Sequence, residues 1–101
     1  MTDRIYSIEE IKDVVAPIAK RYGVDRVYLF GYYARGEATT SSDLDFRVDR
    51  GAIRDLFALG GLYADLEDAF EKHLDLLTTA SLDQKFLSRI AKEEILIYGN
   101  Q

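Results

Sequence analysis

The chain has 101 residues, of which 48% are hydrophobic, and a formal net charge of −5 from 13 Lys and Arg against 18 Asp and Glu. This size allows one domain over residues 1–101, and no apolar run is long enough to cross a membrane. The absence of Cys excludes disulfides and thiolate metal sites and is compatible with the cytoplasmic location that we expect. The acidic balance disfavours direct binding to nucleic acid, because that binding needs a basic field.

The first third of the chain predicts a helix followed by a strand. Ser7 and Glu10 have the spacing of a capping box, and apolar residues then recur at helical spacing until Gly23, a suitable C-terminal cap. Residues 26–30 are predicted as a strand, because the apolar run 27–30 is typical of a buried strand, and Gly31 ends it.

The rest of the chain alternates between strands and helices. The remaining predicted elements are a strand over 43–49, a helix over 53–74, a strand over 74–79, a helix capped by Asp83, and a strand over 95–98. The order α-β-β-α-β-α-β predicts an α/β fold with a central mixed sheet of about four strands packed by helices. The first two strands are joined by a short connection, which favours an antiparallel or mixed pairing over a full crossover.

Three aspartates stand out as candidate metal ligands. Asp43 and Asp45 are two residues apart on a predicted strand, so both side chains point to the same face. Asp75 lies in the next predicted strand among apolar residues, where a carboxylate is costly unless it is paired or bound to a metal. If the two strands are neighbours, three carboxylates converge, and oxygen ligands without His or Cys favour Mg²⁺. Taken alone, the pair Asp43 and Asp45 is better explained by a solvent-facing strand edge, and Asp75 can be explained by an ion pair with a nearby Lys or Arg.

A glycine-flanked turn precedes the aspartates. Gly31 allows a ligand to approach the backbone after the strand, and residues 32–36 can form a turn whose N–H groups point at an anion. Arg35 adds a planar charged fork that suits phosphate oxygens. Such a turn alone is a weak signal, and its combination with the aspartates at this offset is what favours a phosphate site.

The combined pattern resembles that of a known family. The residues that carry it are Gly31, Arg35, Gly36, Ser42, Asp43 and Asp45, which are similar to the Gly-Ser-x10-Asp-x-Asp signature of the DNA polymerase β nucleotidyltransferase superfamily. The chain most resembles the minimal, MNT-type members, which are often partnered with HEPN-domain toxins. The resemblance spans nearly the whole chain, through "RVYLFG", "ARGEATTSSDLDF", "LDLLT" and "ILIYG".

The resemblance implies a specific reaction. It implies a site with two Mg²⁺ ions that transfers AMP from ATP to a tyrosine hydroxyl of a cognate HEPN toxin, which makes the chain an antitoxin. Whether it forms homo- or hetero-oligomers is left open by the sequence. Asp43, Asp45 and Asp75 would be the catalytic and metal-binding acids. The triphosphate would lie against the site's remaining predicted binding residues, Gly31, Tyr32, Arg35 and Ser42.

Two residues depart from a simple match. Tyr32 stands where the family has Ser, and its ring either crowds the phosphates or turns away from them. Arg47 alternates onto the face of Asp43 and Asp45, where it either neutralises them in place of a metal or reaches a phosphate. His73, the single His, is expected at an exposed helix end, and Tyr33 is a second ring that can flank the nucleotide.

Two alternative functions remain open. The chain can be an antitoxin that neutralises its partner by binding alone, which Tyr32 motivates. Transfer to a small molecule such as an aminoglycoside fits less well, because 101 residues leave little length for an acceptor pocket.

Overall fold

The computed structural model describes residues 2–100. Its elements in chain order are α1 (Ile8–Tyr22), β1 (Arg26–Phe30), β2 (Leu44–Asp49), α2 (Leu56–Phe70), β3 (Leu74–Thr78), the 3-10 turn η1 (Thr79–Ser81), α3 (Gln84–Ile90) and β4 (Ile95–Tyr98). The predicted α/β order is confirmed, and the main difference lies at α2, which is shorter than the predicted 53–74. Asp55 sets its start, because the carboxylate accepts the Ala58 N–H at 2.8 Å. Glu71, in the left-handed region at φ 53°, sets its end.

The four strands form one mixed sheet in the order β3-β2-β1-β4. β1 pairs antiparallel with both β2 and β4, whereas β2 pairs parallel with β3. The parallel pair is possible because α2 connects β2 to β3 and returns the chain to the same end of the sheet. β3 is therefore an edge strand, with β2 on one side only.

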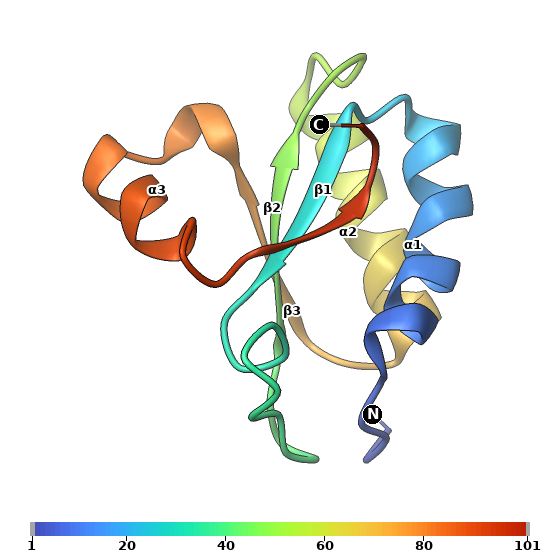
Figure 1. Cartoon of the computed structure of the whole chain (residues 1–101). Helices are drawn as coiled ribbons and strands as arrows, with labels where there is room; N and C mark the ends of the chain where they lie inside the picture. Colours follow the sequence, from blue (N-terminus) through green and yellow to red (C-terminus); the bar gives the residue numbers. More distant parts are fainter. Residues whose placement is uncertain (1, 101) are drawn as a thin grey trace.

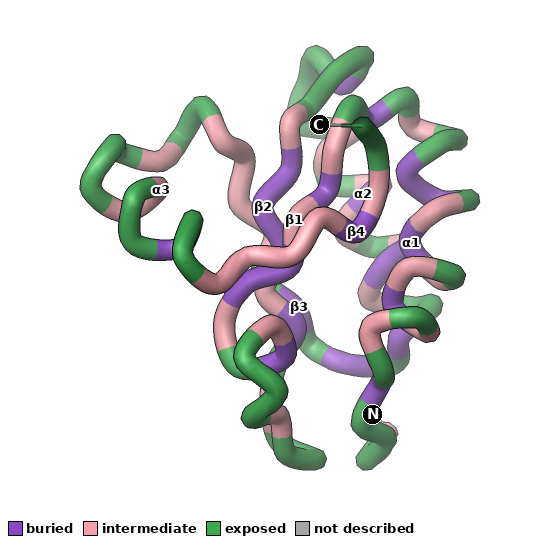
Figure 2. Tube along the Cα trace, in the orientation of Figure 1, coloured by how far each residue is buried: buried purple, intermediate pink, exposed green. Residues whose placement is uncertain are grey.

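Helices α1 and α2 cover one face of the sheet, and α3 lies on the other side (Figure 1). The alternation predicted for β2 places Leu44, Phe46 and Val48 in the core beneath the two helices, all at 0% exposure. The buried positions follow the sheet and the inner faces of α1 and α2 (Figure 2). The opposite face of β2 carries the charged residues, so the chemistry of the chain lies on the α3 side.

Gly61 allows α1 and α2 to approach closely. A Cβ at this position would lie 2.8 Å from the Tyr22 hydroxyl, which donates to Asp65 at 2.7 Å. Gly60, its neighbour, faces open space. Two adjacent glycines weaken a helix locally, but Gly61 has a packing role that accounts for its presence.

The start of α2 is apolar and exposed. The helical spacing of apolar residues in the sequence puts Leu56 on the same side as Leu62 and Leu66 and so predicts a core position for all three. Leu62 and Leu66 are fully buried, but Leu56 and its neighbour Phe57 are 83% and 93% exposed, so the prediction for Leu56 is wrong. Across residues 2–100, no helix has both the length and the hydropathy needed to span a membrane.

Candidate active site

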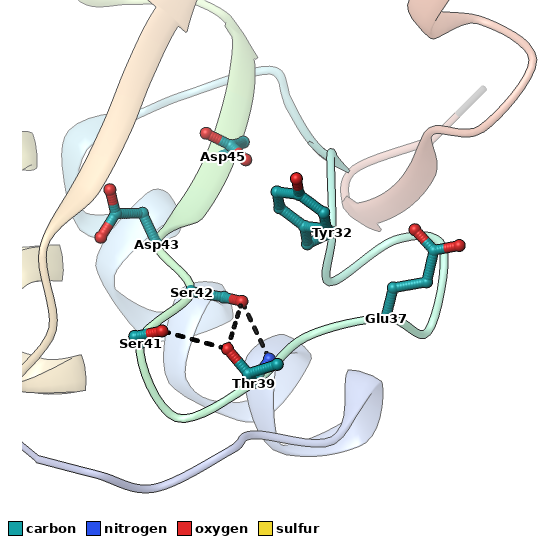
Figure 3. A pocket seen from close by; sticks show the side chains of 7 residues that line it. All are labelled: Tyr32, Glu37, Thr39, Ser41, Ser42, Asp43 and Asp45. Carbon is teal, nitrogen blue, oxygen red and sulfur yellow. Dashed lines mark hydrogen bonds between the residues drawn. The ribbon is translucent and has the colours of Figure 1, made fainter.

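A polar cavity of about 540 Å³ opens on the charged side of the sheet, between the turn after β1 and the start of β2 (Figure 3). The residues that line it are Tyr32, Glu37, Thr39, Ser41, Ser42, Asp43 and Asp45. Four of these were predicted as site residues from the sequence: Tyr32, Ser42, Asp43 and Asp45. The structure therefore brings the predicted turn and the predicted aspartate pair to one cavity.

Asp45 occupies the centre of the sheet beside Asp75. The register pairs Asp45 with Phe30 across the antiparallel ladder and with Asp75 across the parallel one. Residues paired in this way point to the same face, so the two carboxyl groups are neighbours. The condition on which the three-carboxylate hypothesis depended, that the strand of Asp75 lies beside that of Asp45, is met.

This arrangement changes the acidity of Asp45. Burial of the half-buried side chain raises the pKa of Asp45 to about 7, together with a hydrogen bond shared with Asp75 and the negative charges of Asp75 and Asp43. Two of these causes are the like charges that a bound cation would offset. The carboxyl group is thus held in a form that favours either a proton or a positive partner.

Asp75 differs from the sequence expectation in one respect. It was expected as a carboxylate within a buried strand, yet it is exposed, because β3 is an edge strand and Asp75 faces away from the core. It is also not among the residues that line the cavity. Asp75 is therefore assigned to the site because it is the neighbour of Asp45, and not because a buried carboxylate would need a partner.

The donor set fits a metal that binds together with phosphates. Within the part of the chain that the structure describes, no three His, Cys, Asp or Glu side chains are close enough to form a ready metal cage. Asp43 and Asp45 nevertheless face the same cavity, and Asp45 adjoins Asp75. Mg²⁺ is commonly held by one or two carboxylates plus substrate phosphates, so these all-oxygen ligands fit such an ion.

Gly31 begins the turn and lies against Asp45. Its φ is 78°, a conformation that favours glycine, and a Cβ there would overlap the Asp45 carboxylate. The turn is closed by a backbone hydrogen bond, in which the main-chain N–H of Arg35 donates to the Gly31 carbonyl at 3.1 Å. Glycine at this position therefore has two causes, the backbone conformation and the close approach of a candidate metal ligand.

The turn binds a carboxylate of the same chain. The Gly31 N–H donates to Glu93 Oε2 at 2.6 Å, and the Arg35 guanidinium donates to both Glu93 oxygens at 3.2 and 3.1 Å. Arg35 Nε donates to Glu37 at 2.9 Å. Glu93 was missed by the sequence analysis, since it lies 62 residues from Gly31 and no local pattern marks it.

Tyr32 projects its ring at the cavity. The side chain is 55% exposed, and the Arg35 guanidinium lies 4.8 Å from the ring centroid. Figure 3 shows the ring on the side of the cavity that faces Asp45. Of the two sequence alternatives, the ring lines the site and does not turn away from it.

Ser42 closes the loop that leads into β2. Its hydroxyl accepts the Thr39 N–H at 2.8 Å, and its own N–H donates to the Thr39 carbonyl at 3.1 Å. Ser41 adds a contact to the Thr39 hydroxyl at 3.2 Å. Of the loop residues that line the cavity, Ser42 was predicted from the sequence, whereas Glu37, Thr39 and Ser41 were not.

Arg47 belongs to a different group of charges. Its guanidinium donates to Glu94 at 3.0 and 2.7 Å and to Thr79 at 2.7 Å, and it lies 4.1 Å from the centroid of the Tyr28 ring. Both sequence alternatives for Arg47, neutralising the aspartates and reaching a phosphate, are therefore replaced by an ion pair with Glu94.

The two other aromatic candidates lie outside the cavity. His73 is exposed and contacts Glu67 at 3.4 Å, as expected for a residue near a helix end. Tyr33 is buried at 4% exposure, and within residues 2–100 its hydroxyl has no hydrogen-bond partner. It lines a second, smaller cavity beside Tyr6, so the idea that Tyr33 flanks the nucleotide is not supported by its position.

A family model described as "Polymerase beta, Nucleotidyltransferase" matches residues 9–101. A candidate protein adenylyltransferase of Methanocaldococcus jannaschii is 37% identical over 89 residues, which are 88% of this chain and 96% of that protein. The protein adenylyltransferase MntA of Thermococcus cleftensis is 30% identical over 95 residues, 90% of this chain and 96% of its own length.

Solved structures share the fold. A candidate minimal nucleotidyltransferase has a TM-score of 0.77 at 29% identity, over 89% of this chain and 95% of that one. A toxin–antitoxin with AMP-PNP has a TM-score of 0.76 at 22% identity, over 89% and 74% of the two chains. The complex of a tri-AMPylated Shewanella oneidensis HEPN toxin with an MNT antitoxin has a TM-score of 0.71 at 19% identity, over 93% and 74%.

Proposed function

Because the chain belongs to the polymerase β nucleotidyltransferase family and is a minimal nucleotidyltransferase, we propose that it transfers AMP from ATP to a tyrosine hydroxyl of a cognate HEPN-domain toxin. On this proposal it acts as the antitoxin of that toxin. Relatives named protein adenylyltransferases match over nearly their whole length, which supports the reaction. Neighbours that are toxin–antitoxin assemblies support the kind of partner.

One observation carries the proposal: Asp43 and Asp45 face the same cavity as the turn that begins at Gly31, with Asp75 beside Asp45. Metal-assisted phosphoryl transfer uses groups that bind the phosphates and carboxylates that hold the metal ions within one small site. The turn already binds an anion, since the Gly31 N–H and Arg35 hold a carboxylate. Phosphate oxygens are acceptors of the same kind.

The residues take distinct roles in the proposed transfer. The Gly31 N–H and Arg35 bind the triphosphate, and the Ser42 loop borders it. The acceptor oxygen forms a bond to the α-phosphorus, the bond from that phosphorus to the bridging oxygen breaks, and pyrophosphate leaves with the electron pair. The hydroxyl proton passes to the Asp75 carboxylate, which is exposed and accessible to a partner protein.

Asp43, Asp45 and Asp75 are the residues that would hold Mg²⁺. Bound there, the ions would neutralise charge on the phosphates and lower the barrier to transfer. The raised pKa of Asp45 supports this assignment, because a group under repulsion from two like charges gains when a cation binds.

The test is transfer of label from ATP carrying a labelled α-phosphate to the toxin encoded beside this chain's gene. The wild-type protein with Mg²⁺ should label the toxin, and Asp45→Asn should reduce the rate by about a hundredfold or more, as losses of central catalytic groups do. Asp13→Asn, at an exposed position on α1, is the matched control and should keep full activity. No label on the toxin under conditions where ATP binds would refute the proposal.

A second function has specific observations in its favour. Tyr32 lines the cavity, and Glu93 already occupies the turn, which both oppose ready ATP binding. The chain would then neutralise its partner by binding alone. In that case the double variant Asp43→Ala, Asp45→Ala should neutralise the toxin as well as wild type does, whereas loss of neutralisation with binding retained would support transfer.

A further inference from the structure

We propose that Glu93 is an internal competitor for the anion-binding turn, so that a nucleotide can occupy the turn only after the Glu93 carboxylate leaves it. The inference rests on the proposed function, because it assigns the turn to the phosphates of ATP. It adds a residue outside the aspartate set that sets the affinity for nucleotide.

The contacts of Glu93 are those that a phosphate would make. Its Oε2 atom accepts both the Gly31 N–H at 2.6 Å and an Arg35 N–H at 3.1 Å. Its Oε1 atom accepts from the same Arg35 nitrogen at 3.2 Å. A backbone N–H on a positive-φ glycine next to a guanidinium is a common anion-binding arrangement, and it cannot serve two anions at once.

The contact with the backbone distinguishes this arrangement from an ordinary surface ion pair. A pair made only by Arg35 and Glu93 would contribute little to stability, since exposed ion pairs are screened by water and salt. Here the Glu93 side chain is only 24% exposed and ends on a main-chain N–H at the end of a central strand. The position of the Gly31 N–H, the donor in this contact, is therefore fixed by the sheet and does not depend on a side-chain conformation.

The segment that carries Glu93 is anchored on both sides. The N–H groups of Glu93 and Glu94 donate to the Ile90 carbonyl at 3.0 and 2.9 Å, at the end of α3. The Glu94 side chain is bound by Arg47 in a two-point ion pair. The backbone therefore presents Glu93 to the turn, and removal from the turn requires only a change in the Glu93 side chain.

The turn is ready for another anion once Glu93 has moved. Glu37 accepts from Arg35 Nε at 2.9 Å, independently of Glu93, and so continues to orient the guanidinium. The Gly31 N–H and the Arg35 nitrogen that Glu93 used then become available. Departure of the carboxylate also removes one negative charge from a site that already contains Asp43 and Asp45.

The experiment compares Glu93→Gln, which keeps the shape, and Glu93→Ala, which empties the position, with wild type. Glu9→Gln, at an exposed position on α1, is the matched control. Calorimetric titration with Mg²⁺ and inorganic tripolyphosphate measures anion binding without a nucleoside or an acceptor. We expect Glu93→Gln to bind tripolyphosphate about tenfold more tightly than wild type, a change on the scale of one charge-assisted hydrogen bond. Glu93→Ala should show a larger gain in affinity. The control should bind as wild type does.

A second measurement reports on the contact itself. The amide resonance of Gly31 in a ¹H–¹⁵N spectrum should move in both Glu93 variants before any ligand is added, because the hydrogen bond to the carboxylate is lost or weakened. An unchanged resonance would overturn the proposal, whatever the titrations give.

The outcomes separate this inference from the proposed function. Tripolyphosphate binding that is equal in all variants, weaker in the Glu93 variants, or absent throughout overturns the role of Glu93. Tighter binding in the Glu93 variants without any transfer to the toxin supports that role and counts against the transfer reaction. Transfer of label by wild type together with unchanged tripolyphosphate binding in the Glu93 variants supports the transfer reaction and overturns the role of Glu93.

Discussion

Arg47 and Glu94 form a two-point ion pair, with the Arg47 guanidinium donating to the two Glu94 carboxylate oxygens at 3.0 and 2.7 Å. Arg47 is 8% exposed, although it lies on the face of the sheet that carries the site. The pair ties the segment after α3 to the middle of β2. Because Glu93 precedes Glu94, the same pair places the Glu93 carboxylate at the Gly31 turn.

Removal of Arg47 should destabilise the fold. Arg47→Ala leaves Glu94 in a mostly buried position without its partner, and we expect the free energy of unfolding to fall by about 2–4 kcal/mol. Urea denaturation measures the change. Arg54→Ala, at an exposed position, is the matched control and should stay within about 0.5 kcal/mol of wild type. Equal effects of the two variants would contradict a stabilising role for the pair.

Asp45 should make the stability of the metal-free protein depend on pH. Because burial, Asp75 and Asp43 raise its pKa to about 7, the folded chain holds a proton that the unfolded chain has already lost. The free energy of unfolding should therefore fall as pH rises from the ordinary aspartate range towards 7, and this contribution should be absent above it. Urea denaturation with a chelator, from pH 4 to 8, should show a weaker decline in Asp45→Asn than in wild type.

The same site should reverse this trend when Mg²⁺ is supplied. At pH 8 Asp45 is ionised, so added Mg²⁺ should raise the melting temperature of wild type by ligand linkage. Asp45→Asn should respond much less, and Asp13→Asn should respond as wild type does. A rise of equal size in all three proteins would indicate that the ion binds elsewhere.

Gly31 and Gly36 offer a matched pair of substitutions. Both have positive φ, 78° and 75°, but a Cβ at Gly31 overlaps the Asp45 carboxylate, whereas one at Gly36 meets nothing within 4 Å. We expect Gly36→Ala to cost about 1 kcal/mol and Gly31→Ala about 2–3 kcal/mol in unfolding free energy. In an Asp45→Ala background the excess cost of Gly31→Ala should shrink, because the clashing group is gone. An undiminished excess would show that another contact causes it.

Tyr32 should limit transfer more than stability. Its ring is largely exposed and lines the cavity, so Tyr32→Ser should change the unfolding free energy by less than about 1 kcal/mol and leave more room for phosphates. We expect a higher rate of label transfer from ATP to the toxin. Tyr32→Phe keeps the ring and should behave as wild type does. A slower Tyr32→Ser variant would mean that the ring contributes to nucleotide binding.

Local patterns in the sequence were sufficient for most of the fold. Ser7 and Gly23 bound the first helix, Asp83 caps α3, and the alternation along β2 correctly separates the core face from the charged face. These features depend on hydrogen bonds and side-chain directions within a few residues, so they can be predicted from short stretches of sequence. The α2 start was predicted too early, at residue 53, because the apolar pattern extends in front of Asp55, the residue that caps the helix.

The candidate site likewise has features that local sequence predicts and features that it does not. The groups that could do the chemistry, namely the aspartates, the Gly31 turn and Arg35, can be identified from the sequence, because their types and spacing are visible along the chain. Which partners these groups have depends on the tertiary structure. The order of the strands places Asp75 beside Asp45 at an exposed edge, and the return of the chain after α3 brings Glu94 to Arg47 and Glu93 to Gly31. These contacts join residues dozens of positions apart, and their energies depend on distance in space and on exclusion of water, which no local pattern records.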